Sequence, residues 1–106
     1  MPEVFATNKH AQGYYGVFKQ NLPDAFAIMD ETTQEKWTKL AFQVDEVVDQ
    51  AVSENSINPQ NIEADVRKKL LPIIFSECKS LGGGIDQAKR IVESIVQIVR
   101  VGRLDS

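Results

Sequence analysis

Residues that build metal centres and disulfides are almost missing from the chain. Its 106 residues include one cysteine, Cys78, and one histidine, His10. A lone cysteine cannot form an internal disulfide, so we expect a cytoplasmic protein. One histidine and one cysteine cannot supply the nitrogen and sulfur ligands of a zinc site. We therefore expect no metal and no cofactor.

Long apolar runs are missing as well. No stretch approaches the roughly 20 apolar residues of a membrane-spanning helix, and residues 1–10 lack the basic and apolar segments of a secretory signal. We expect no membrane contact. A hydrophobic share of 42% is still enough for one core. The sequence predicts a flexible N-terminus at 1–8, one folded domain at 9–102 and a tail at 103–106.

Charge is unevenly spread along the chain. Residues 1–58 carry four Lys and nine Asp or Glu, a net charge of −5, whereas residues 59–106 carry eight Lys or Arg and six Asp or Glu, a net charge of +2. Such polarity can orient the chain against a charged partner. It is too mild to predict nucleic-acid binding by itself, because DNA-binding domains are usually strongly basic.

The first half contains two segments with the apolar spacing of a helix. Residues 9–22 follow a cap at Asn8 and end before a proline, which cannot continue a helix. The pattern leaves the conformation of residues 24–29 open. In the second segment Thr32 and Glu35 form a capping box. Its apolar residues make one stripe, namely Trp37, Leu40, Ala41, Val44, Val47, Val48, Ala51 and Val52.

The second half contains two more helical segments. Asn58 and Pro59 are a favourable cap and first position. The helix that follows reaches Leu81, with Gly82 in the left-handed C-terminal position. Pro72 lies inside it and predicts a kink or a split. The apolar stripe is Ile62, Val66, Leu70, Ile73 and Ile74.

The last helix is predicted to begin at Asp86, a good N-terminal cap, and to end at Gly102. Its stripe is Ala88, Ile91, Val92, Ile95, Ile98 and Val99, broadened by Val96. A strand over residues 95–101 is the weaker alternative, because the apolar period is 3.6 residues and no partner strand is evident. The four segments together predict an all-α bundle of four to five helices.

Two patterns imitate catalytic sites. Gly82–Gly84 precedes a helix as phosphate-binding loops do, but the P-loop Lys is missing and Asp86 would repel phosphate. Asp24, which follows a proline, imitates a metal-dependent nuclease pattern together with Glu77 and Lys79. These residues fall in a turn and a helix rather than on adjoining strands, so we interpret the match as coincidence. We expect no catalytic residue and no small-molecule substrate.

The other reactive and aromatic residues are interpreted as structural. His10 has no acidic or nucleophilic companion nearby and is expected at the surface near a frayed terminus. Cys78 is expected in the core. Trp37, Phe42, Tyr14 and Tyr15 are expected to pack in the core. Docking on a partner is the alternative for the helix that bears Trp37.

Basic residues are the one notable charge feature. Candidates for contact with DNA or with a protein partner are Arg67, Lys68, Lys69, Lys89 and Arg90. One face of these helices could contact a phosphate backbone, although a solvated helical surface is the simpler interpretation. Glu63 and Asp65 flank the first three residues and are expected to cancel part of their field.

Several runs of sequence resemble a known family. Those in the second half are NPQNIE (58–63), VRKKLLP (66–72), AKRIVE (88–93) and QIVRVG (97–102). Those upstream are YGVF (15–18), LA (40–41) and VDEVV (44–48). In this order they resemble the C-terminal end of the R subunit of type I restriction enzymes, over roughly residues 10–102.

The R subunit is the large motor and nuclease chain of these enzymes. The resemblance implies a C-terminal helical part of an ATP-dependent, site-specific deoxyribonuclease. None of the family's catalytic motifs is present, so no catalytic residue is carried over. The leading hypothesis is a non-catalytic domain that assembles with the modification and specificity subunits or packs on the rest of the R subunit. The alternatives are a DNA-contacting module of the same complex and a stand-alone bacterial helical adaptor or regulatory protein.

Overall fold

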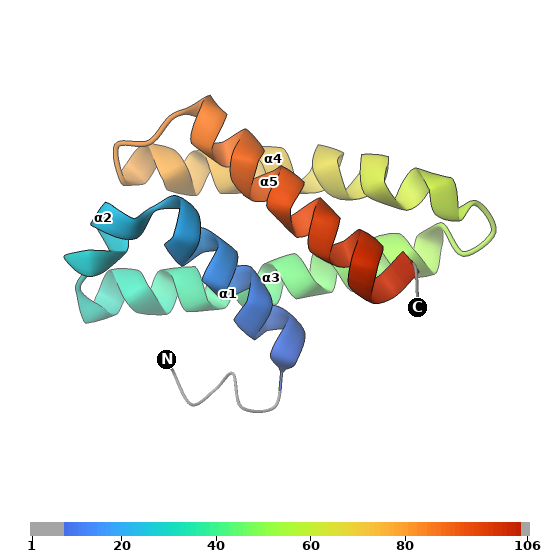
Figure 1. Ribbon diagram of the computed structural model, residues 1–106, viewed down its shortest axis with the longest axis horizontal. Coiled ribbons are helices and arrows are strands. Elements are labelled where there is room, and N and C mark those ends of the chain that lie inside the picture. Colours follow the sequence, from blue (N-terminus) through green and yellow to red (C-terminus); the bar gives the residue numbers. More distant parts are fainter. Residues whose placement is uncertain (1–7, 105–106) are drawn as a thin grey trace. The chain divides into compact units, whose positions relative to one another are not determined.

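The computed structural model describes residues 8–104, with the side chains of residues 8–102. This range forms five α-helices and no strand, so the predicted all-α bundle of four to five helices is confirmed (Figure 1). The predicted flexible segment lies outside the described residues except for Asn8, as does the predicted tail from residue 105 on. The chain divides into two compact units, Met1–Glu46 and Val47–Ser106. A single domain over 9–102 stays a prediction.

The first unit holds α1 (Lys9–Asn21), α2 (Pro23–Ala27) and the beginning of α3 (Glu31–Glu54). The predicted cap of α1 is confirmed, because the side-chain oxygen of Asn8 accepts a hydrogen bond from the Ala11 N–H at 3.0 Å. The stretch that the sequence left open is the short helix α2. It starts at a proline, whose fixed φ suits the first helical position.

The capping box predicted for Thr32 and Glu35 is wrong. Oδ1 of Asp30 accepts a hydrogen bond from the Thr33 N–H at 2.8 Å, so α3 begins at Glu31 and Thr32 lies in its first turn. Aspartate ranks above threonine as an N-terminal cap, and here it lies at the distance of three residues that capping requires. The side-chain hydrogen bond from Thr33 lowers the pKa of Asp30.

Aromatic side chains form the core of the first unit. Trp37 is 1% exposed and meets the rings of Phe18 and Phe26 edge to face, with centroids 5.0 and 5.7 Å away. Tyr14 and Tyr15 are buried too, whereas Phe42 is only half-buried. The prediction that Trp37 and the two tyrosines are core residues is therefore confirmed.

The second unit holds the end of α3, α4 (Ile62–Ser80) and α5 (Ile85–Val99). The helices α4 and α5 pack side by side and antiparallel (Figure 1). Their buried residues follow the predicted stripes: Ile62, Val66, Leu70, Ile74 and Cys78 on α4, and Ala88, Ile91, Val92, Ile95, Val96 and Val99 on α5. Ile73 and Ile98, also expected in the stripes, are only half-buried.

The start and the interior of α4 differ from the prediction. Pro59–Asn61 forms a 3₁₀ turn, and the α-helix begins only at Ile62. Asn58 makes no side-chain capping bond, which leaves the tighter turn to satisfy the first N–H groups. Pro72 does not split the helix, which runs unbroken through it. Because Pro72 is exposed, the backbone groups that it leaves unpaired can bond to water.

A glycine turn ends α4 as the sequence predicts. Gly82 has φ of +80°, the left-handed conformation that favours glycine. Its N–H donates to the carbonyl of Lys79 at 3.1 Å, and the N–H of Gly83 donates to the carbonyl of Cys78 at 2.8 Å. These two bonds are those of a Schellman motif, which satisfies carbonyls that the helix end would leave unpaired.

Both ends of α5 differ from the prediction. The N-terminal cap is Gly84 rather than Asp86, because the N–H of Gly84 donates to Oε1 of Gln87 at 2.7 Å and the helix already includes Asp86. The other end does not stop at Gly102. Residues Arg100–Leu104 continue as a π-helical turn that includes Gly102.

Candidate partner-binding site

The three consecutive basic residues of α4 point in three directions. Successive residues of an α-helix are about 100° apart, so neighbours cannot share a face. Arg67 forms an ion pair with α5, whereas Lys69 forms one with the end of α3. Lys68 is exposed and has no ion pair to a described residue. These three cations therefore do not form one basic face.

Arg67 is held between two carboxylates. Its Nε and Nη2 donate to the two carboxylate oxygens of Glu93 at 2.7 and 3.1 Å, a bidentate pair. Its Nη2 also lies 3.8 Å from Oε1 of Glu63, which accepts a hydrogen bond from Arg100. The hydrogen bond from Arg67 lowers the pKa of Glu93, and the one from Arg100 lowers the pKa of Glu63.

Lys69 is likewise neutralised. Its Nζ lies 3.2 Å from Oδ2 of Asp65 and 3.3 Å from Oε2 of Glu54, and the hydrogen bond with Asp65 is the main cause of its raised pKa. The prediction that Glu63 and Asp65 cancel part of the positive field is confirmed, because each lies within ion-pair distance of a cation of this cluster.

The two candidates on α5 differ in position. Lys89 and Arg90 are both exposed, and neither has an ion pair to a described residue. Lys89 lines a groove between α4 and α5, together with Arg67. Arg90 does not. Of the five residues that the sequence selected, the structure thus brings Arg67 and Lys89 together at one feature.

The edge along which α4 and α5 meet has a regular pattern. Residues spaced by one helical turn on α4 face residues of the antiparallel α5 or of the π-helical turn that follows it. We define the α4–α5 seam by its three rungs, which are Glu63 with Arg100, Arg67 with Glu93, and Leu71 with Lys89. The first two rungs join opposite charges. The third places a lysine opposite a leucine.

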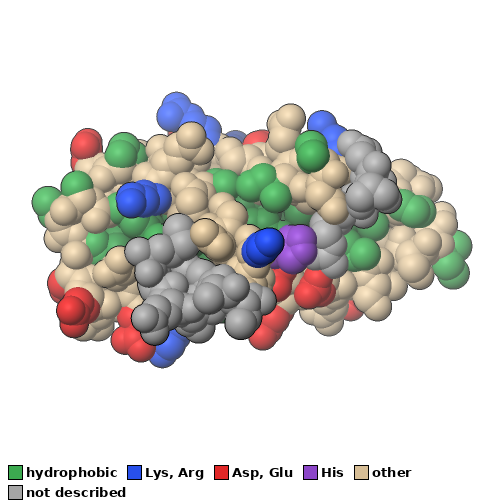
Figure 2. Space-filling view, turned by 60° about the horizontal axis from the view of Figure 1, so that its bottom comes forward, with side chains coloured by type: hydrophobic (Ala, Val, Ile, Leu, Met, Phe, Trp, Pro, Cys, Tyr) green, Lys and Arg blue, Asp and Glu red, His purple; other side chains and the backbone are tan. Residues whose placement is uncertain are grey.

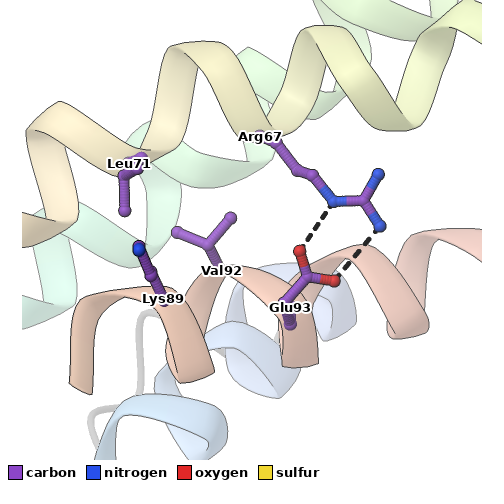
Figure 3. Close-up of a pocket in the computed structure, with 5 residues that line it drawn as sticks. All are labelled: Arg67, Leu71, Lys89, Val92 and Glu93. Carbon is purple, nitrogen blue, oxygen red and sulfur yellow. Dashed lines mark hydrogen bonds and ion pairs between the residues drawn. The ribbon is translucent and has the colours of Figure 1, made fainter. Parts of the chain in front are cut away.

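A groove of about 260 Å³ lies at the third rung. Leu71 and Val92 form its apolar floor, and its charged walls are Lys89 and the bidentate pair of Arg67 and Glu93 (Figure 3). Leu71 and Lys89 point toward one another across it. The apolar floor can hold an aliphatic group of a ligand. Lys89 beside it has no carboxylate partner and can pair with a negative charge on the same ligand.

Leu71, Val92 and Glu93 were not selected from the sequence. A signal for part of the site was present, because Arg67 and Leu71 are four residues apart, as are Lys89 and Glu93, and such pairs share a helix face. The pairing of these two faces depends on how α4 and α5 are aligned. That alignment is fixed by the packing of the two stripes, which no local spacing reveals.

The glycine loop is not a phosphate site in this structure. The N–H groups of Gly82 and Gly83 donate to carbonyls of α4, and that of Gly84 donates to Gln87. All three amides are thus used within the chain, which fits the interpretation of the loop as a helix–helix turn.

The nuclease-like residues fall in different units. Asp24 belongs to α2 in the first unit, and Glu77 belongs to α4 in the second. Within residues 8–104, no group of three or more His, Cys, Asp or Glu side chains is placed to hold a metal ion.

The two lone reactive residues have the predicted locations. His10 is exposed in the first turn of α1, where it is the purple side chain of Figure 2. Cys78 is fully buried in α4, and burial raises the pKa of its thiol. A raised pKa disfavours the thiolate, so Cys78 is a packing residue rather than a nucleophile.

Comparison with known proteins adds no relative. No protein-family model, no curated protein and no solved structure matches the chain. In the part of the chain that the structure describes, none of the helices combines the length and the apolar character that crossing a membrane requires.

Proposed function

We propose that the chain is a non-catalytic C-terminal helical domain of a type I restriction enzyme R subunit, located in the cytoplasm. It serves assembly with the modification and specificity subunits or packing on the rest of the R subunit. The resemblance of residues 58–63, 66–72, 88–93 and 97–102 to that family supports the proposal. These runs include the first part of α4 and much of α5, so the resemblance falls on the helices that carry the seam.

The observation that carries the docking role is the composition of the groove. Its floor is apolar, and its walls hold charges of both signs. Protein interfaces combine an apolar centre with a polar rim in this way. The neutralisation of Arg67 and Lys69 by carboxylates further favours a protein over a phosphate backbone.

A DNA-contacting role in the same complex is the second candidate. It is favoured by Lys68, Lys89 and Arg90, which are exposed and have no ion pair to a described residue. It is weakened by Glu93, which lines the same groove as Lys89 and holds the guanidinium of Arg67 in a bidentate ion pair, so Arg67 is not available to a phosphate.

The proposal is tested by titrating the 106-residue chain against two purified probes. One is the cognate complex of modification and specificity subunits, and the other is the R subunit truncated before its C-terminal helices. We expect saturable binding to at least one of them by isothermal titration calorimetry. Absence of binding to both would contradict the proposal.

A pair of matched variants locates the surface. Leu71→Lys places a charge on the groove floor and is expected to weaken binding about tenfold or more, because a buried unpaired charge is costly. Ile57→Lys makes the same change in charge at a side chain that is 89% exposed and outside the groove, and is expected to bind like the wild type. Equal effects of the two substitutions would exclude the groove as the docking surface.

A further inference from the structure

The third rung of the seam lacks the carboxylate that the other two possess. Glu63 faces Arg100 and Glu93 faces Arg67, but the α4 residue opposite Lys89 is Leu71. Lys89 is exposed and forms no ion pair with a described residue. Of the three cations of the seam, Arg100 and Arg67 therefore each face a carboxylate, whereas Lys89 does not.

The size and the charge of the groove at this rung limit the kinds of ligand that can occupy it. Its volume of about 260 Å³ falls below the roughly 300 Å³ at which pockets for drug-sized ligands begin. Two cations and one carboxylate line it, which leaves an excess of positive charge. An aliphatic side chain fits its floor, and a carboxylate fits the side of Lys89.

We infer that the occupant is a segment of a protein partner that carries an aspartate or glutamate beside an aliphatic side chain. The aliphatic group lies on Leu71 and Val92, and the carboxylate completes the third rung by pairing with Lys89. This inference rests on the proposed function and names the chemistry of its partner. A nucleic-acid phosphate fits less well, because it has no aliphatic group to cover the floor and meets Glu93 at the wall.

The test reverses the charge of the third rung. Lys89→Glu in the 106-residue chain is expected to weaken binding to the probe that the wild type binds, about tenfold or more, and Lys89→Gln is expected to weaken it less. Lys39→Glu is the matched control, since Lys39 is exposed on α3 and outside the groove. Its affinity is expected to stay within about twofold of the wild type, because isolated surface charges contribute little.

Salt and competition distinguish the outcomes. Raising the ionic strength from about 0.1 M to about 0.5 M is expected to weaken wild-type binding more than that of Lys89→Gln, because the ion pair is screened.

If the wild type binds and Lys89→Glu binds equally well, the inference is wrong and the proposed function stands. If neither probe binds the wild type, the proposed function itself fails. If duplex DNA displaces the probe from the wild type but not from Lys89→Glu, the occupant is a phosphate, and the inference is overturned.

Discussion

Trp37 is the largest fully buried side chain among the described residues. It is 1% exposed and contacts Phe18 and Phe26 through edge-to-face ring pairs. Trp37→Ala is expected to lower the free energy of unfolding by about 3–5 kcal/mol, the usual effect of deleting a large core side chain. Urea unfolding followed by far-ultraviolet circular dichroism measures this change without relying on tryptophan fluorescence.

Two further substitutions make this prediction specific. Ile28→Ala removes an aliphatic side chain that is 88% exposed and is expected to change the free energy of unfolding by less than about 0.5 kcal/mol. Trp37→Phe is expected to cost less than Trp37→Ala, partly because the buried indole N–H has no hydrogen-bond acceptor among the described residues. A loss below about 0.5 kcal/mol for Trp37→Ala would contradict a core role.

The bidentate pair of Arg67 and Glu93 gives the second unit a pH-dependent contribution to stability. The hydrogen bond from Arg67 lowers the pKa of Glu93 below its ordinary value of 4.5. Since the folded-state pKa is the lower one, the contribution is complete above about pH 4.5 and is lost as the pH falls through the folded-state value. Glu93 is 57% exposed, so solvent screening keeps the contribution below about 1 kcal/mol.

Glu93→Gln tests this contribution. At pH 7 we expect a small decrease in the urea midpoint relative to the wild type, and at about pH 3 we expect the difference to shrink toward zero. Glu46→Gln is the control, because Glu46 is exposed on α3 and forms no ion pair with a described residue. A difference of the same size at both pH values would show that Glu93 acts through packing rather than through its charge.

At the scale of elements, the turn between α4 and α5 sets a clear test. Gly82 has φ of +80°, a conformation that costs an L-residue roughly 1–2 kcal/mol. Gly82→Ala is therefore expected to lower the free energy of unfolding by about 1 kcal/mol, although no atom would clash with the added methyl group.

The matched substitution, Gly16→Ala, is expected to change the free energy of unfolding in the opposite direction. Gly16 lies in α1 with open space around it, and Gly16→Ala is expected to raise the free energy of unfolding by roughly 0.5–1 kcal/mol, because alanine is the better helix former. Thermal melting of both variants checks the pair. A stabilising Gly82→Ala would contradict the Schellman geometry of the turn.

Apolar periodicity predicts the helices well, whereas capping residues are a less reliable indication of where each helix begins and ends. The buried stripes of α3, α4 and α5 follow spacings of three and four residues, which only a helix places on one face. The predicted caps of α3 and α5 are wrong because a residue two positions upstream takes the capping position in each helix. Asp30 displaces Thr32, and Gly84 displaces Asp86, through hydrogen bonds that depend on backbone geometry.

The site was less predictable than the fold. A run of three cations reads as one basic patch in the sequence, but helical geometry separates Arg67 from Lys69 and pairs each with carboxylates. The flanking acids on α4 signalled part of this cancellation. Glu93 lies 26 residues from Arg67, and no local pattern announces such a contact. The contact between Arg67 and Glu93 depends on how α4 and α5 are aligned in the folded chain.

At the scale of the whole molecule, the distribution of charge argues against DNA binding by this chain alone. The net charge of +2 over residues 59–106 overstates the positive field available to a ligand, because Arg67, Lys69 and Arg100 are ion-paired. Residues 1–58 carry a net charge of −5, which repels phosphate at long range. Four described cations of α4 and α5 are exposed and form no ion pair with a described residue, namely Lys68, Lys79, Lys89 and Arg90. The ammonium of Lys79 lies over the ring of Phe75, with its Nζ 5.4 Å from the ring centroid.

We therefore expect the 106-residue chain to bind duplex DNA more weakly than micromolar at physiological salt. Each neutralised phosphate contributes a slope of about −0.9 in log affinity against log salt, so phosphate contacts by Lys68, Lys89 and Arg90 would give about −2.7. Fluorescence anisotropy at two salt concentrations measures the slope for the wild type and for the triple variant with alanine at Lys68, Lys89 and Arg90. Alanine at Lys9, Lys19 and Lys39, all exposed in the first unit, is the matched control. Micromolar or tighter binding, lost only in the first variant, would make DNA contact the better account of these helices.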